Sequence, residues 1–131
     1  MAIRLAIAAI VALAIGCVLD LRHRRFVRWE IDGRSMLPCL HPGDWVIVET
    51  ATRARRPLRT GDVVLVPDPR DARRMLVKRV VHLGEGDRAW LEGDNPAEST
   101  DSRQFGPVRA RDIVGRVIFR YHPIGRLGRV R

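Results

Sequence analysis

Cysteine is scarce in this sequence. Its 131 residues include two cysteines, Cys17 in an apolar segment and Cys39 in the polar remainder. Two cysteines do not supply the disulfide framework of a small secreted domain, nor a zinc site of four thiolates. The four histidines lack the paired spacing of metal ligands. The sequence therefore predicts no bound metal and no other cofactor.

Aromatic and acidic residues are also few. Aromatic residues make up 5% of the chain, whereas glycine and proline number 11 and 8, a balance typical of short strands and turns. Lys and Arg outnumber Asp and Glu by 24 to 15, and the formal charge of +9 favours phosphate-bearing partners. No recognition helix, zinc site or aromatic stacking platform accompanies these charges, so we expect a lipid partner and no nucleic acid.

Long apolar runs are confined to the amino terminus. The uncharged run from Leu5 to Leu19 would span roughly 22 Å as a helix, and its neighbours extend it towards the thickness of a bilayer. We therefore predict one transmembrane helix and a basic juxtamembrane segment in residues 1–28, followed by one folded domain in residues 29–131. A cleaved signal peptide ending near Cys17 is the alternative. The arginines expected to contact lipid head groups are Arg22, Arg24, Arg25 and Arg28.

Beyond residue 28, short β-type runs alternate with turn residues. The predicted strands are Trp45–Glu49, Asp62–Val66, Met75–Leu83, Ala89–Glu92 and Ile113–Tyr121. The segment from Gly93 to Gly106 is predicted to be a polar loop, and the charged stretches Arg53–Arg59 and Asp68–Arg74 are predicted to be solvent-facing connections. The fold class is therefore mainly β.

Lysine is almost absent, because Lys78 is the one lysine among the 24 basic residues. Arginine cannot lose its proton near neutral pH, whereas lysine can do so when burial or a nearby cation lowers its pKa. On a strand, the side chain of Lys78 would share a face with Leu76 and Val80, an apolar setting that disfavours the ammonium form. The residue is a candidate general base, although a lysine stem that covers apolar surface is the simpler interpretation.

Ser35 lies between Gly33 and Pro38, in a segment where glycine and proline favour a tight connection that exposes the hydroxyl. On its own, such a serine is most often an ordinary turn residue whose hydroxyl bonds the local backbone. Together with Lys78, however, it supplies the two groups that a Ser/Lys hydrolase needs.

Five short motifs in the same order resemble the successive conserved boxes of the signal peptidase I family of serine endopeptidases. They are Gly33–Pro38, Pro42–Asp44, Gly61–Val64, Val77–Val81 and Gly93–Gly106. The resemblance implies a small folded-sheet or barrel-like catalytic domain of the signal peptidase type over residues 29–131. It also implies a membrane-anchored protease that removes an extended amino-terminal signal or propeptide from a precursor protein.

The resemblance further assigns roles to individual residues. Ser35 corresponds to the nucleophile and Lys78 to its base, while Ser99 corresponds to the hydroxyl that orients the lysine amine. Asp101 and Arg103 correspond to a pair that braces the site, although an exposed ion pair of little energetic value is the alternative for them. Two further supporting residues, Gly33 and Met36, belong to the serine motif. Gly33 stands where some members carry an oxyanion-binding hydroxyl, so here the donors would be backbone amides, first that of Ser35.

The sequence departs from the family pattern in ways that bear on its assignment. Cys39 stands where the family usually has threonine, and only a brief link joins Leu83 to Trp90 where larger members insert a subdomain. The amino-acid sequence of the loop Gly93–Val108 most resembles that of the nickel-type superoxide dismutase maturation proteases, a branch of the family. The basic cluster after the apolar run predicts a cytoplasmic domain, whereas secretory signal peptidases face the other way, so the side of the membrane stays open.

Three other functions are compatible with these residue types. A self-cleaving repressor-type domain shares Ser/Lys chemistry but would need an amino-terminal DNA-binding helix pair, which the apolar start does not provide. A non-catalytic basic module for lipid or nucleic acid would leave Ser35 and Lys78 as bystanders. A triad of Ser35, His82 and an aspartate is the third possibility.

Overall fold

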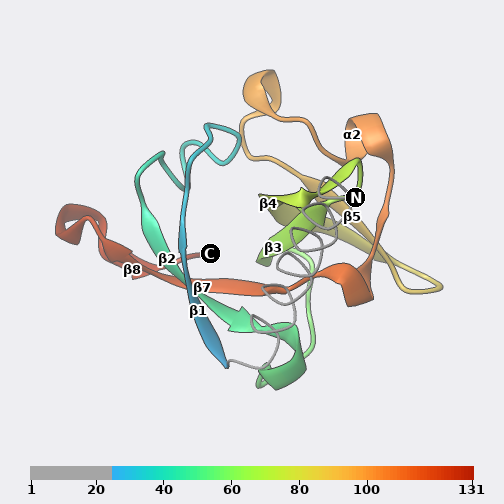
Figure 1. The fold of residues 1–131 in the computed structure, drawn as a ribbon, viewed down its shortest axis with the longest axis horizontal. Coiled ribbons are helices and arrows are strands. Elements are labelled where there is room, and N and C mark those ends of the chain that lie inside the picture. Colours follow the sequence, from blue (N-terminus) through green and yellow to red (C-terminus); the bar gives the residue numbers. More distant parts are fainter. Residues whose placement is uncertain (1–24) are drawn as a thin grey trace, which may run out of the picture.

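The computed structural model describes residues 25–131, which form an antiparallel sheet with a few short helical turns (Figure 1). The strands are β1 (Phe26–Glu30), β2 (Trp45–Thr50), β3 (Val63–Asp68), β4 (Asp71–Gly84), β5 (Arg88–Glu92), β6 (Val108–Arg109), β7 (Gly115–His122) and β8 (Gly128–Arg129). The helical turns are η1 (Ala51–Arg53), η2 (Pro96–Glu98), α2 (Ser102–Phe105), η3 (Ala110–Asp112) and η4 (Ile124–Arg126). The prediction of a mainly β domain is confirmed.

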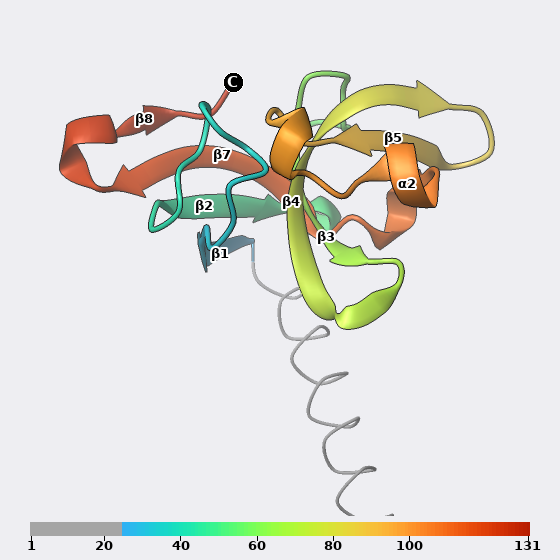
Figure 2. The same ribbon diagram turned by 90° about the horizontal axis from the view of Figure 1, so that it is seen from above.

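The strands follow the order β1-β2-β7-β3-β4-β5-β6, with β8 paired to β7. Figure 2 shows β1, β2, β7 and β8 on one side of the molecule and β3, β4, β5 and α2 on the other. The strand β1 begins at Phe26 and pairs with β2 along its whole length, so the sheet includes residues 26–28, which lie before the predicted domain boundary. Residues 1–24 of the anchor and basic segment predicted for 1–28, with Arg22 and Arg24, lie outside the described residues.

Two hydrophobic clusters meet at β3, the most apolar strand. Its side chains alternate, with Val63 and Leu65 in one cluster and Val64 and Val66 in the other. All four are at most 2% exposed, because a strand that lies between two packed layers buries both of its faces. The continuous apolar run of β3 therefore reflects its central position in the fold.

Two of the predicted loops contain regular structure. Residues 71–74 belong to β4 rather than to a charged connection, because β3 and β4 pair down to Asp68 and Asp71 around a tight turn. The loop from Gly93 contains η2 and α2, and Asp101 caps α2 by accepting a hydrogen bond from the Arg103 amide. The polar composition of these two segments predicted loops. Their conformation is instead determined by the groups with which their backbone forms hydrogen bonds.

No helix within residues 25–131 is long and apolar enough to cross a membrane.

Candidate active site

Ser35 lies on the turn that joins β1 to β2. The turn is closed by hydrogen bonds from the Ile31 amide to the Asp44 carbonyl (2.8 Å) and from the Gly43 amide to the Ile31 carbonyl (2.7 Å). Met36, 1% exposed, anchors the turn in the first hydrophobic cluster, so the neighbouring Ser35 stays partly exposed. The buried methionine thus fixes the position of the serine.

The loop after β5 clamps the same turn from the other side. The Asn95 amide donates to the Ser35 carbonyl over 2.8 Å, and its side chain donates to the Arg34 carbonyl over 3.1 Å. A Cβ atom on Gly93 would lie 2.3 Å from the Ser99 hydroxyl and 2.6 Å from the Ser35 carbonyl oxygen, far inside contact distance. Only glycine therefore lets these two segments approach each other so closely. The structural role of Asn95 and Gly93 did not emerge from the sequence.

Lys78 lies on β4, opposite Val64 of β3, and is 3% exposed. Its amine donates a hydrogen bond of 3.1 Å to the hydroxyl of Ser99. Burial lowers the pKa of Lys78 below its ordinary value of 10.5, the carboxylate of Asp101 opposes this effect and the guanidinium of Arg103 adds to it. The Lys78 amine in this environment therefore loses its proton more readily than an exposed lysine does.

Asp101 connects Ser99 to the surrounding backbone. Its carboxylate is fully buried and accepts hydrogen bonds from the Ser99 hydroxyl, the Gly93 amide (2.8 Å) and the Arg103 guanidinium (2.6 Å). Burial by itself would raise the pKa of Asp101, but the hydrogen bonds from Arg103, Gly93 and Ser99 outweigh it and hold the pKa well below its usual range. In the Asp101–Arg103 pair, Asp101 has no contact with solvent, whereas 31% of the Arg103 side chain is exposed.

The polar groups form one directed chain. Because Ser99 has a single hydroxyl hydrogen, which points to the Asp101 carboxylate, its lone pairs are left to accept from Lys78. This arrangement orients the lysine amine. When the amine is neutral, its lone pair is free to accept a hydrogen bond from another group.

Ser35 and Lys78 line the same cleft, which encloses about 580 Å³. Gly33 and Met36 of the serine turn line it too, together with apolar side chains of β1 and β4 and several arginines. Among residues 25–131 no hydrogen bond joins the Ser35 hydroxyl to the Lys78 amine, which bonds to Ser99 instead. His82 does not line this cleft and its side chain is exposed, so the arrangement does not favour the triad.

The described residues contain no cluster of His, Cys, Asp and Glu that could hold a metal ion. Of the other candidates, Arg25 stacks on the ring of Phe26 at 5.3 Å, Arg28 is exposed on β1, and Cys39 is partly buried with its thiol directed to the Arg131 carbonyl.

Comparisons with known proteins identify the family of this chain. The family described as signal peptidase, peptidase S26, matches residues 3–88 and 85–122. The chain is 35% identical to the mitochondrial ATP-independent inner membrane protease subunit 1a of Arabidopsis thaliana, over 88% of this chain and 82% of that protein. It is 34% identical to the human mitochondrial inner membrane protease subunit 1, over 76% and 71% of the two chains.

A third relative is subunit 2 of the mitochondrial inner membrane protease of Schizosaccharomyces pombe, which is 31% identical over 76% of this chain and 67% of its own. These matches confirm the resemblance deduced from the five motifs. The chain therefore belongs to the signal peptidase family, peptidase S26, and is a serine-type endopeptidase.

Proposed function

We propose that this protein is a membrane-anchored endopeptidase that removes an amino-terminal signal or propeptide from a precursor, with Ser35 as nucleophile and Lys78 as general base. One observation carries the proposal: the single lysine of the sequence is buried at 3% exposure in the cleft that also contains the motif serine. A buried amine whose pKa is lowered can act as a base, which no arginine can.

The catalytic cycle starts with neutral Lys78. Its amine takes the hydroxyl proton of Ser35 while the serine oxygen attacks the scissile carbonyl, and a tetrahedral oxyanion forms. The backbone amide of Ser35 is the first candidate donor to this oxyanion, since Gly33 offers no hydroxyl. The ammonium of Lys78 then protonates the departing amine, and the carbon–nitrogen bond breaks.

An acyl-enzyme on Ser35 remains after this step. Lys78, again neutral, takes a proton from water while the water oxygen attacks the ester carbonyl. The Lys78 ammonium then gives this proton to the Ser35 oxygen as the carbon–oxygen bond breaks, which restores the free serine. Ser99 acts as a positioning residue in both halves, because its hydroxyl holds the amine at 3.1 Å. Asp101 and Arg103 fix the hydroxyl of Ser99 in turn.

The substrate would bind as an extended strand beside the cleft. On one side, β4 pairs with β3 over Asp71–Arg79, but on the other side its pairing with β5 begins only at Arg79. The second edge of residues 71–78 therefore has no strand partner in the described part of the chain, and it leads directly to Lys78. A precursor segment can add main-chain hydrogen bonds there, and apolar cleft residues such as Ile31 and Val77 would select its side chains.

A membrane location fits both the apolar run Leu5–Leu19 and the relatives, which are named as inner membrane proteases. We propose a single amino-terminal anchor with the catalytic domain beside the bilayer. Because the loop Gly93–Val108 resembles the nickel-type superoxide dismutase maturation branch, a precursor of that enzyme is a substrate to compare with a precursor that carries an ordinary secretory signal.

The proposal is tested with the full-length chain in detergent micelles and a set of precursor proteins. Mass spectrometry of the products should locate one cut behind an amino-terminal extension, and Ser35→Ala should abolish it while thermal unfolding stays unchanged. His82→Ala should cleave normally. Wild-type cleavage by Ser35→Ala would refute the proposal, and loss of cleavage in His82→Ala would favour the triad in its place.

A further inference from the structure

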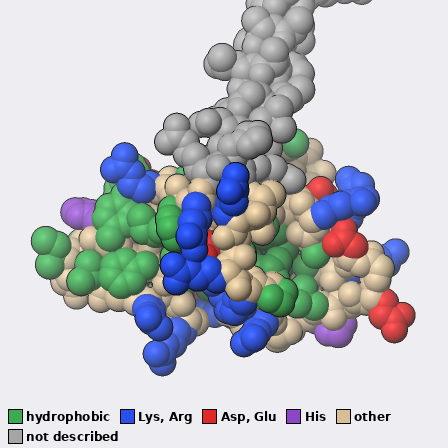
Figure 3. Space-filling model, turned by 90° about the horizontal axis from the view of Figure 1, so that it is seen from below, with side chains coloured by type: hydrophobic (Ala, Val, Ile, Leu, Met, Phe, Trp, Pro, Cys, Tyr) green, Lys and Arg blue, Asp and Glu red, His purple; other side chains and the backbone are tan. Residues whose placement is uncertain are grey.

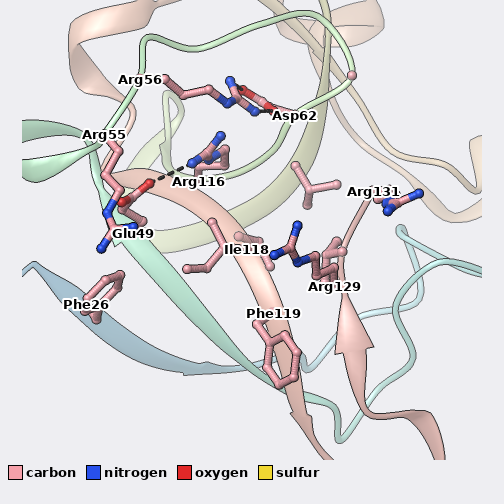
Figure 4. Close-up of a pocket in the computed structure, with 14 residues that line it drawn as sticks. Phe26, Glu49, Arg55, Arg56, Asp62, Arg116, Ile118, Phe119, Arg129 and Arg131 are labelled. Atoms are coloured by element: carbon pink, nitrogen blue, oxygen red, sulfur yellow. Dashed lines mark hydrogen bonds and ion pairs between the residues drawn. The ribbon is translucent and has the colours of Figure 1, made fainter.

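A second cavity, distinct from the cleft of Ser35 and Lys78, is lined by arginine and apolar side chains. It encloses about 570 Å³ between the start of β1, the segment after η1, and strands β7 and β8. Figure 4 shows its lining, in which Glu49 and Asp62 each face an arginine. The two carboxylates are bound by Arg116 over 2.7 Å and by Arg56 over 2.6 Å.

Three further arginines of this cavity are not neutralised by an acidic side chain. Arg55, Arg129 and Arg131 form no ion pair within residues 25–131, whereas the side-chain carboxylates of Glu49 and Asp62 are already paired. Guanidinium groups bind phosphate oxygens in a bidentate manner and are more weakly hydrated than ammonium groups. The cavity therefore has unused positive charge of the kind that recognises a phosphate group.

Apolar side chains lie next to these charges. Phe26, 46% exposed, lines the cavity together with Ile118 and Phe119 of β7. Figure 3 shows one face of the molecule, on which basic side chains form a band beside a group of hydrophobic side chains. A ligand that fits both features combines an anionic phosphate with apolar groups.

The position of the cavity in the chain indicates the source of such a ligand. Phe26 carries the stacked guanidinium of Arg25 and follows closely, in sequence, on the apolar run Leu5–Leu19. If that run is the membrane anchor, the cavity lies where the chain leaves the bilayer. We propose that this cavity binds the head group of an anionic phospholipid, with Arg55 and Arg129 as its phosphate ligands and Phe26 against its glycerol and acyl carbons.

The test uses the full-length chain, purified in detergent and mixed with equal amounts of phosphatidylglycerol and phosphatidylcholine that carry the same acyl chains. Native mass spectrometry counts the lipids retained. The double variant Arg55→Gln/Arg129→Gln should reduce the ratio of phosphatidylglycerol to phosphatidylcholine roughly thirtyfold, because each of the two basic side chains near an anionic head group contributes about 1 kcal/mol. The charge-matched control Arg88→Gln/Arg109→Gln, on the distant strands β5 and β6, should keep the wild-type ratio.

Three results would overturn this proposal: an unchanged ratio in the Arg55/Arg129 variant, an equal fall in the control, or displacement of phosphatidylglycerol by inorganic phosphate alone. The last result would mark a site for free phosphate. Thermal unfolding of each variant shows whether the fold is intact, and Arg129→Gln alone provides a milder change. Ser35→Ala should bind lipid like the wild type, so a failure of the lipid site and a failure of the proposed proteolysis are seen separately.

Discussion

Replacement of Lys78 by methionine separates catalysis from stability. Methionine matches the stem of the buried side chain out to Cε but lacks the terminal amine, and with it the hydrogen bond to Ser99. Because general base catalysis contributes about 10²–10⁴-fold and the members of a catalytic unit act together, we expect kcat/KM for precursor cleavage to fall by at least about 10³-fold. The residue is 3% exposed and burial lowers its pKa, so loss of the amine should leave the unfolding temperature equal or higher.

The assay is cleavage of a precursor by the full-length chain, followed across pH. In the wild type, kcat/KM should rise with pH as Lys78 loses its proton, and this rise should lie below pH 10.5, because the pKa of the amine is lowered. Lys78→Arg keeps a permanent charge and should also be inactive, whereas Arg88→Lys, at an exposed position of β5, should cleave normally. The double variant Ser35→Ala/Lys78→Met should be no slower than Ser35→Ala alone. Substantial cleavage by Lys78→Met in a folded protein would refute the role of the lysine.

Three further predictions follow from the hydrogen-bonded chain and the clamp. Gly93→Ala should abolish cleavage and destabilise the domain by about 1–3 kcal/mol, because its Cβ would lie 2.6 Å from the Ser35 carbonyl, whereas Gly33→Ala, with nothing within 4 Å, should unfold like the wild type. Ser99→Ala should lower kcat with little change in KM. A rise in KM as large as the fall in kcat would contradict a positioning role. Asp101→Asn should lower stability by about 2 kcal/mol near pH 7. Since the folded pKa of Asp101 lies below 3.8, this difference should be complete above pH 3.8 and shrink in more acidic solution, as urea denaturation can measure.

Several elements of the fold could be predicted because local pattern and tertiary environment agree. The strand from Trp45 and the one around Lys78 both combine β-branched residues with turn residues at their ends, and the structure contains both. The strand β1 was missed although Arg28 and Glu30 alternate with apolar residues, because the segment directly follows the basic cluster and was assigned to it. Its pairing with β2 is a long-range contact that charge does not reveal.

The candidate site shows the same division. Ser35, Lys78, Ser99 and Asp101 carry their chemistry in the residue type, so a motif can identify them. The clamp of Asn95 on the serine turn consists of a backbone amide and a carbonyl, and such contacts depend on which loops meet rather than on side-chain chemistry.

The strand β3, with both faces buried, has a consequence for how the protein opens. Val64 and Leu65 belong to different hydrophobic clusters. If β3 left the sheet, side chains of both clusters would therefore be exposed to water. The amides of β3 should therefore exchange with deuterium only through global unfolding, at the slowest rates in the domain. Local motion that admits a precursor should therefore occur in the loops of Ser35 and Asn95. These loops come from the two halves of the sheet and meet at the hydrogen bond from the Asn95 amide to the Ser35 carbonyl.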